Sequence, residues 1–204
     1  MKTYPSISKQ IETGTPVFIF DKLDGSNIRA EWSKKKGFYK FGTRKRLLDP
    51  NETPLGYATK LIEEKYSDKL SYAFKRERIE KAVCFFEFFG KNSFAGNHDE
   101  NDIFDLTLID ISLYKKGIIP PKDFIDWADR YYLQIPRILG YENITENLIE
   151  KIKNNTLDNM SFEGVVCKHK KKKEVKMFKI KSNAWLEKLK NYCGEDTTLF
   201  EELA

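Results

Sequence analysis

Positions 21–27 of the chain read Asp-Lys-Leu-Asp-Gly-Ser-Asn, and this stretch joins two segments that are typical of β-strands. The apolar run over 17–21 predicts a buried strand, and residues 27–32 predict a second one. Taken alone, Asp-Gly between two such segments is a strong hairpin signal. On that interpretation Lys22 is an ordinary exposed strand residue.

The rest of the chain predicts strands alternating with helices. Further strands are predicted over residues 37–41, 81–89, 105–113, 163–168 and 175–180, and helices over 54–76, 121–132, 145–153 and 182–192. Thr145 and Ser182 are candidate N-caps, and residues 91–101 predict a polar loop. Because several strands follow one another through short turns, the pattern favours an antiparallel α+β fold over a βαβ fold. No linker divides the chain, so a single domain over 1–204 is expected.

Composition excludes several classes of protein. The 204 residues are 40% hydrophobic and 14% aromatic, which is not typical of disorder. No apolar run approaches the ~18 residues of a membrane span. Three widely spaced cysteines and two histidines argue against a disulfide framework and a Cys/His zinc site. Without an apolar leader-like N-terminus, a reduced cytoplasmic protein is expected. The net charge of +5 permits an anionic partner without requiring one.

Three further motifs carry candidate chemistry. Glu87 lies among four phenylalanines, so its carboxylate is expected to be partly buried and to need a partner or a cation; strand alternation could still turn it to solvent. Glu163 begins a second β-rich run. Lys179 and Lys181 share one face of a strand, where two ammonium groups can clamp phosphate oxygens, although an amphipathic edge strand has the same pattern.

In order and spacing, these motifs resemble those of the covalent nucleotidyltransferase superfamily, which contains ATP-dependent DNA ligases, RNA ligases and mRNA capping enzymes. Glu87 follows Lys22 by 65 positions (87 − 22), and Lys179 follows Glu163 by 16 (179 − 163). The resemblance implies an antiparallel-sheet adenylyltransferase domain and identifies Lys22 as the nucleotide-accepting lysine. It implies a nucleotide site formed by Asp21, Lys22, Asn27, Arg44, Glu87, Ile109, Glu163, Lys179 and Lys181.

Within this superfamily the chain looks most like the nick-sealing RNA ligases of RNA repair. Asn27 and the segment Phe-Lys-Ile-Lys-Ser at 178–182 favour that branch. Asp24, by contrast, is more typical of DNA ligases, so a minimal ATP-dependent DNA ligase is the alternative. Ile109 stands where an aromatic residue often stacks on adenine. Arg46 is an alternative to Arg44 as the arginine that contacts the nucleotide.

The resemblance also implies a mechanism. Lys22 would attack the α-phosphate of ATP, AMP would pass to a 5′-phosphate end, and a 3′-OH would then displace it. Nearby cations are expected to lower the pKa of Lys22 and free its amine. Arg44 and the two lysines near residue 180 would hold phosphates. Glu87 and Glu163 would bind Mg²⁺ or Mn²⁺ or its hydration shell, because carboxylates and waters suit these ions.

The length of the chain and its lysine runs give expectations about protein and nucleic-acid partners. The chain ends 23 residues after Lys181 (204 − 181), so we expect no OB-fold, which argues against a capping enzyme and leaves room for a partner protein in its place. Lysine runs could bind the nucleic-acid backbone, although solvated turns have the same composition; they comprise Lys34, Lys35, Lys36, Lys170, Lys171, Lys172 and Lys173. A non-catalytic nucleic-acid-binding remnant is a third interpretation.

Overall fold

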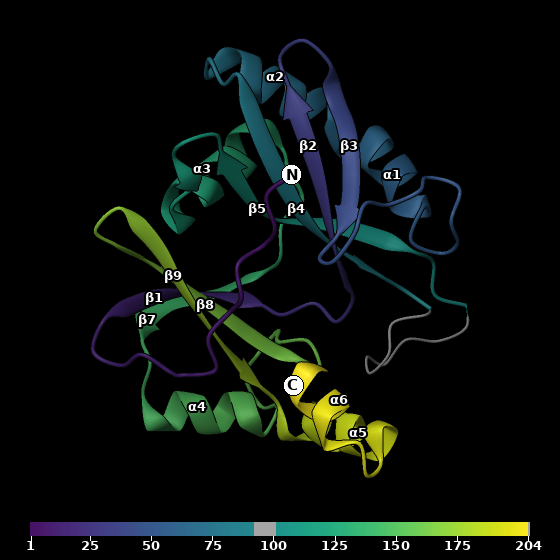
Figure 1. The fold of residues 1–204 in the computed structure, drawn as a ribbon. Coiled ribbons are helices and arrows are strands. Elements are labelled where there is room, and N and C mark those ends of the chain that lie inside the picture. Colours follow the sequence, from purple (N-terminus) through teal and green to yellow (C-terminus); the bar gives the residue numbers. More distant parts are fainter. Residues whose placement is uncertain (92–100, 204) are drawn as a thin grey trace.

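A computed structural model of the chain describes residues 1–91 and 101–203. Within these residues, strands form two antiparallel sheets, one above the other in the view of Figure 1, and helices flank them. The α+β fold predicted from sequence is confirmed. Most of the polar loop predicted over 91–101 lies outside the described residues.

The upper sheet has five strands in the order β3-β2-β4-β5-β6. Its strands are β3 (Gly37–Thr43), β2 (Ser26–Ser33), β4 (Lys81–Phe89), β5 (Asp105–Leu113) and β6 (Gly117–Ile118). One face packs against helices α1 (Tyr57–Ile62), η1 (Glu63–Ser67), α2 (Asp68–Arg76) and α3 (Pro121–Tyr131). Phe86 and Phe88 point to this helix-covered face. Alternation therefore turns Glu87 to the opposite face, which looks toward the second sheet.

The lower sheet has four strands in the order β7-β1-β8-β9. They are β7 (Ile138–Asn143), β1 (Pro16–Asp21), β8 (Gly164–Lys171) and β9 (Glu174–Lys181). Helix α4 (Glu146–Lys153) covers it through Leu148 and Ile152. Helices α5 (Asn183–Cys193) and α6 (Thr197–Leu203) follow β9 and form a small cluster of their own. Thr145 and Ser182 cap α4 and α5 as predicted.

The hairpin interpretation of Asp24-Gly25 is wrong. Strands β1 and β2 belong to different sheets and do not pair, so residues 22–25 form the connection between the sheets. The backbone N–H of Lys22 instead donates to the carbonyl of Gly164, 2.9 Å away. Gly25 passes so close to β4 that a Cβ there would lie 2.3 Å from the carbonyl oxygen of Phe88. Glycine is therefore required here for close approach rather than for a tight turn.

Other elements differ from prediction at their ends or were not predicted. The helix expected over 54–76 begins at Tyr57 and contains a π-helical segment, η1. Strands β6 and β7 and helix α6 had no prediction. The predicted hairpin of β8 and β9 is confirmed, with Val166 opposite Lys179 and Gly164 opposite Lys181.

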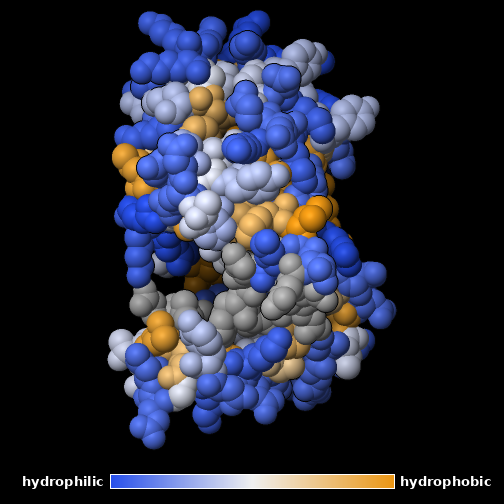
Figure 2. Space-filling model, turned by 90° about the vertical axis from the view of Figure 1, so that its right-hand side faces the viewer, coloured by the Kyte–Doolittle hydropathy of each residue, from blue (hydrophilic) through white to orange (hydrophobic). Residues whose placement is uncertain are grey.

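The surface seen from the side is mainly hydrophilic, with hydrophobic groups gathered in patches near the middle of the molecule (Figure 2). Among the described helices, none combines the length and apolar character that a bilayer span requires.

Candidate active site

A cavity of about 630 Å³ opens where the connection between β1 and β2 crosses from one sheet to the other. Its volume lies in the range of pockets that hold small-molecule ligands. The structure brings all nine predicted nucleotide-site residues to its wall. They are Asp21, Lys22, Asn27, Arg44, Glu87, Ile109, Glu163, Lys179 and Lys181.

Glu163 is the centre of charge in this cavity. One of its carboxylate oxygens lies 2.7 Å from the ammonium of Lys22 and 3.1 Å from that of Lys181. The Glu163 side chain is only 4% exposed, whereas that of Lys22 is 18% exposed and reaches the cavity. The two lysines supply the counter-charges that a buried carboxylate needs.

The prediction that the pKa of Lys22 is lowered is wrong for the protein alone. Burial is the largest influence and lowers this pKa, but the carboxylates of Glu163, Glu87 and Asp24 together outweigh it and raise the pKa above its ordinary value. The cations expected to act on Lys22 share the cavity with these acids. Lys22 is thus held as an ammonium in the ligand-free protein.

The positive charges near Glu87 do not offset the burial of its carboxylate. Burial raises its pKa to about 8, and the nearby carboxylate of Glu163 adds to this, while Lys22 acts in the opposite direction. A carboxyl group in this state has a strong tendency to take up a proton or a cation. Glu87 projects from β4 into the cavity as part of the face opposite the helices.

Lys179 and Lys181 both face the cavity from β9. Burial lowers the pKa of Lys179 to about 8 and that of Lys181 to about 7, and the like charge of Lys22 contributes to both shifts. The Lys181 ammonium also lies 3.5 Å from the centroid of the Trp185 ring on α5. Because these like charges lie close together in the cavity, anionic oxygens that enter it would stabilise the charged forms of both lysines.

Two further predicted residues are fixed by the backbone around them. Asp21 accepts a hydrogen bond of 2.7 Å from the N–H of Ser161, whose hydroxyl in turn donates to the carbonyl of Lys22. Asn27 donates to the carbonyl of Phe86, and its buried Oδ1 has no hydrogen-bond partner among the described residues. Asp21 therefore positions the loop, whereas Asn27 offers a free acceptor to a ligand.

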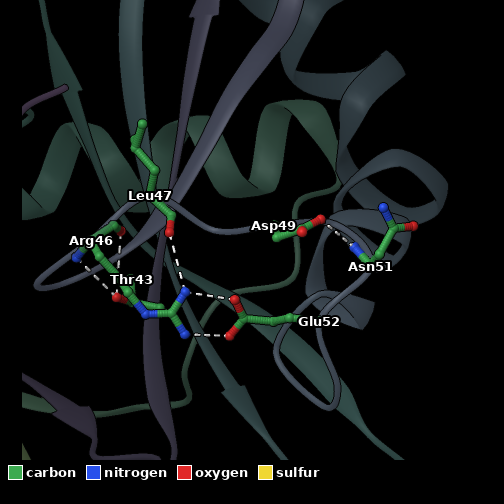
Figure 3. A network of polar contacts seen from close by, with 6 residues as sticks. All are labelled: Thr43, Arg46, Leu47, Asp49, Asn51 and Glu52. Atoms are coloured by element: carbon green, nitrogen blue, oxygen red, sulfur yellow. Dashed lines mark hydrogen bonds and ion pairs between the residues drawn. The ribbon is translucent and has the colours of Figure 1, made fainter.

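The structure separates Arg44 from Arg46. Arg44 lines the cavity. Arg46 makes a two-pronged ion pair with Glu52 on the outside of the molecule (Figure 3). Its backbone N–H and carbonyl hydrogen-bond to Thr43, which holds the intervening turn. Of the two arginines, Arg44 is placed to meet a ligand.

Sequence reasoning missed a buried ion pair at the cavity wall. The Lys168 ammonium lies 2.7 Å from Asp110 and 2.8 Å from the carbonyl of Ile109, and Tyr4 donates to the same carboxylate. Lys168 and Tyr4 both line the cavity. Alternation along β8 could have found Lys168, because it places this lysine on the same face as Val166, another lining residue.

The lysine runs lie away from this cavity. Lys34–Lys36 are exposed at the tip of the β2–β3 hairpin, and Lys170–Lys173 are exposed at the tip of β8–β9. The two tips point in different directions in Figure 1. Lys34 pairs with Glu80, and Lys171 pairs with Glu12. Their predicted contact with nucleic acid stays a prediction.

The residues present fit a divalent cation whose remaining ligands come from elsewhere. Glu87 and Glu163 both reach the cavity. Among the described residues, no group of three His, Cys, Asp or Glu side chains could hold a metal alone. That matches the habit of Mg²⁺, which takes one or two carboxylates and completes its shell with waters and substrate phosphates.

Comparison with known proteins places this fold and cavity in a family. The family described as RNA ligase matches residues 15–181. No curated protein matches the chain. Because the family match spans most of the sequence, the chain belongs to the RNA ligase family.

Solved structures share the fold at low identity. A Naegleria gruberi RNA ligase mutant with ATP and Mn is 21% identical with a TM-score of 0.63, covering 86% of this chain and 52% of that one. An archaeal ATP-dependent RNA ligase is 18% identical with a TM-score of 0.69, covering 95% and 52%. A putative ATP-dependent DNA ligase from Aquifex aeolicus is 18% identical with a TM-score of 0.67, covering 100% and 57%. The chain thus spans little more than half the length of these proteins.

Proposed function

We propose that the protein is an ATP-dependent RNA ligase that joins 3′-OH and 5′-phosphate ends through a lysyl-AMP intermediate on Lys22. The observation that carries this proposal is the cavity in which the Lys22 amine meets Glu163, with Lys181 on the same carboxylate. Family membership over residues 15–181 supports it. Nicks or breaks in a duplex are the proposed substrate.

In the first step the Lys22 nitrogen attacks the α-phosphorus of ATP, an N–P bond forms, and the bond to the pyrophosphate leaving group breaks. The amine must lose its proton first, and the Glu163 carboxylate oxygen at 2.7 Å is positioned to accept it. Lys179, Lys181 and Arg44 line the same cavity and would hold the phosphate oxygens in line.

In the second step a 5′-phosphate oxygen attacks the phosphorus of the lysyl-AMP, and Lys22 leaves as the amine. In the third step a 3′-hydroxyl attacks the 5′-phosphate and AMP leaves. Every step is a displacement at phosphorus, so the protein contributes mainly position and charge. The free acceptor of Asn27 would receive a hydroxyl or amino group of the nucleoside.

A divalent cation such as Mg²⁺ or Mn²⁺ supplies neutralisation of phosphate charge when bound. Glu87 and Glu163 are the residues that would hold it. The raised pKa of Glu87, about 8, supports this role, because burial leaves that carboxylate short of compensating charge. The Naegleria structure named above contains Mn.

The test is transfer of label from ATP to protein. Wild type incubated with α-labelled ATP and Mg²⁺ is expected to retain the label through denaturing electrophoresis, and Lys22→Ala to retain none. Lys151→Ala, which changes an exposed lysine in the last turn of α4, is the control and should be labelled like wild type. Equal labelling of wild type and Lys22→Ala would refute the role of Lys22.

A minimal ATP-dependent DNA ligase is the second candidate. Asp24, which lines the cavity, favours it, and the putative DNA ligase from Aquifex aeolicus matches along the whole chain. Sealing of nicked RNA, DNA and hybrid duplexes by the same preparation decides between the two. Sealing confined to all-DNA nicks would favour the second candidate.

A further inference from the structure

A second hollow lies on the same sheet face as the candidate active site. Its volume is about 540 Å³, and Glu31, Val83 and Ser112 line it. Asn27, Arg29 and Glu31 alternate along β2 and therefore share one face. Asn27 lines the first cavity and Glu31 the second. Four residues of extended strand separate them, roughly 13 Å at about 3.3 Å per residue.

Positive charge and an aromatic ring meet at this hollow. Lys2, Lys81 and Lys115 line it together with Tyr114. Tyr114 is 63% exposed, so its ring is open to solvent. The Lys81 and Lys115 ammonium groups are 5.7 and 5.5 Å from its centroid. Lys2 donates to the hydroxyl of Ser112 at the floor of the hollow.

The end of the sheet extends this positive charge. The Lys34–Lys36 turn is next to the start of β4, because Ser33 pairs with Lys81. Lys116 continues the β5–β6 turn beside Lys115. Glu80 is engaged by Lys34 and Glu31 by Tyr39, so the nearby acids already have partners. Lysines from two turns and from the first residue of β4 therefore gather at this end of the sheet.

Lysines that flank an exposed aromatic ring match the chemistry of a nucleic-acid strand. Phosphates bind ammonium groups, and any base can stack on an aromatic face without sequence preference. We propose that this second hollow docks a nucleic-acid strand, with phosphates on Lys81 and Lys115 and a base stacked on Tyr114. The inference rests on the proposed function in taking that strand to be the one whose end enters the first cavity.

The spacing of the two hollows sets the position of the docked nucleotide. Tyr114 lies level with the start of β4, because its N–H donates to the carbonyl of Lys81, which pairs with Ser33. Ser33 is six strand positions past Asn27 (33 − 27), roughly 20 Å at about 3.3 Å per residue, or about six stacked nucleotides at about 3.4 Å each. The nucleotide on Tyr114 would thus lie about six positions from the reacting end. Because the hollow is open and its ring largely exposed, it suits a passing strand better than an enclosed free nucleotide.

The experiment measures RNA binding and lysine adenylylation separately. Binding of a fluorescent single-stranded RNA of about ten nucleotides is followed by anisotropy, without ATP, at several salt concentrations. The variants are Tyr114→Ala, Tyr114→Phe and the double variant Lys81→Ala/Lys115→Ala. The charge-matched control is Lys151→Ala/Lys153→Ala, two exposed lysines in the last turn of α4.

We expect Tyr114→Ala to bind the RNA about 5- to 100-fold more weakly, the loss of one stacked base, and Tyr114→Phe to bind like wild type. The double variant should bind more weakly and lower the salt slope by about 1.4, which is two phosphates at about 0.7 each. The control should match wild type. All variants should accept label from ATP as wild type does.

RNA binding that is unchanged in both Tyr114→Ala and Lys81→Ala/Lys115→Ala would overturn the docking site. So would an equal loss in the α4 control, which would show only general attraction. Loss of labelled AMP binding in Tyr114→Ala with RNA binding intact would assign the hollow to a free nucleotide and overturn it too. If wild type accepts no label but RNA binding still depends on Tyr114, the docking site stands and the proposed reaction fails.

Discussion

The Lys22 ammonium lies 2.7 Å from a carboxylate oxygen of Glu163, although 141 positions separate the two residues (163 − 22). The backbone reinforces this pairing, since the Lys22 N–H donates to the carbonyl of Gly164. Both the backbone and the side-chain amine of Lys22 are therefore held by the segment Glu163–Gly164. Its reactivity depends on what else competes for the Glu163 carboxylate.

Glu163→Gln is expected to make the Lys22 amine more reactive and the enzyme less active. The substitution removes the carboxylate closest to Lys22 while burial remains, so the pKa of Lys22 should fall. Reductive methylation of Lys22 near neutral pH, followed by mass spectrometry, should be faster than in wild type. Labelling by ATP should fall at least about tenfold, the equivalent of about 1.4 kcal/mol. Glu80→Gln, at an exposed pair, is the control; Lys22 methylation no faster than in that control would contradict the prediction.

Arg44→Ala is expected to impair transfer of label from ATP, whereas Arg46→Ala should preserve it. Arg44 faces the cavity, and Arg46 is occupied by Glu52 at the surface. A charged hydrogen bond to phosphate is worth about 1.5–3 kcal/mol, so the rate should fall roughly 10- to 100-fold in Arg44→Ala. Both variants lose one positive charge, so an equal loss in each would argue against the distinction.

Glu87→Gln is expected to stabilise the fold at the expense of activity. The folded-state pKa of about 8 exceeds the ordinary value of 4.5, so the wild-type carboxylate costs stability as pH rises through this interval. The variant should be more stable by about 1–3 kcal/mol near neutral pH. Urea denaturation should show a difference that is small near pH 4.5, grows with pH, and levels off above about pH 8. A difference that does not vary with pH would contradict the assignment.

Asp110→Asn is expected to be strongly destabilising, because it leaves the buried Lys168 ammonium without its counter-charge. Both side chains are at most 4% exposed. Breaking a buried pair on one side costs about 3–5 kcal/mol. Glu80→Gln, which breaks the exposed pair with Lys34, should cost less than about 1 kcal/mol. Equal unfolding midpoints for the two variants in urea would show that the buried pair contributes little.

Local patterns in the sequence predicted much of the fold. The β8–β9 hairpin and the helix caps at Thr145 and Ser182 followed from short-range signals that the structure retains. Edge strand β7 could not be found in this way, because its largely exposed residues carry no regular apolar pattern. The Asp-Gly signal failed because Gly25 is needed for close approach to Phe88, which is 63 positions further along the chain.

The candidate site was predicted in its members but not in its electrostatics. The resemblance to the nucleotidyltransferase superfamily identified nine of the residues that line the cavity, among them Lys22 and Lys181. The direction of the Lys22 pKa shift was predicted wrongly. This pKa depends on all the charges that folding brings together, and the prediction considered the nearby cations but not the carboxylates of Glu163 and Glu87. The ion pair of Lys168 and Asp110 was missed for the same reason, because the local sequence of neither strand indicates that the two residues will be in contact.

Lys22 lies on the connection that carries the chain from one sheet to the other. A tilt of either sheet must therefore change the width of the cleft and the aim of the amine in a single motion. Under the proposed function, substrate binding and the orientation of Lys22 would therefore depend on the same connection. Substitutions that stiffen this crossing are consequently expected to slow capture and chemistry together.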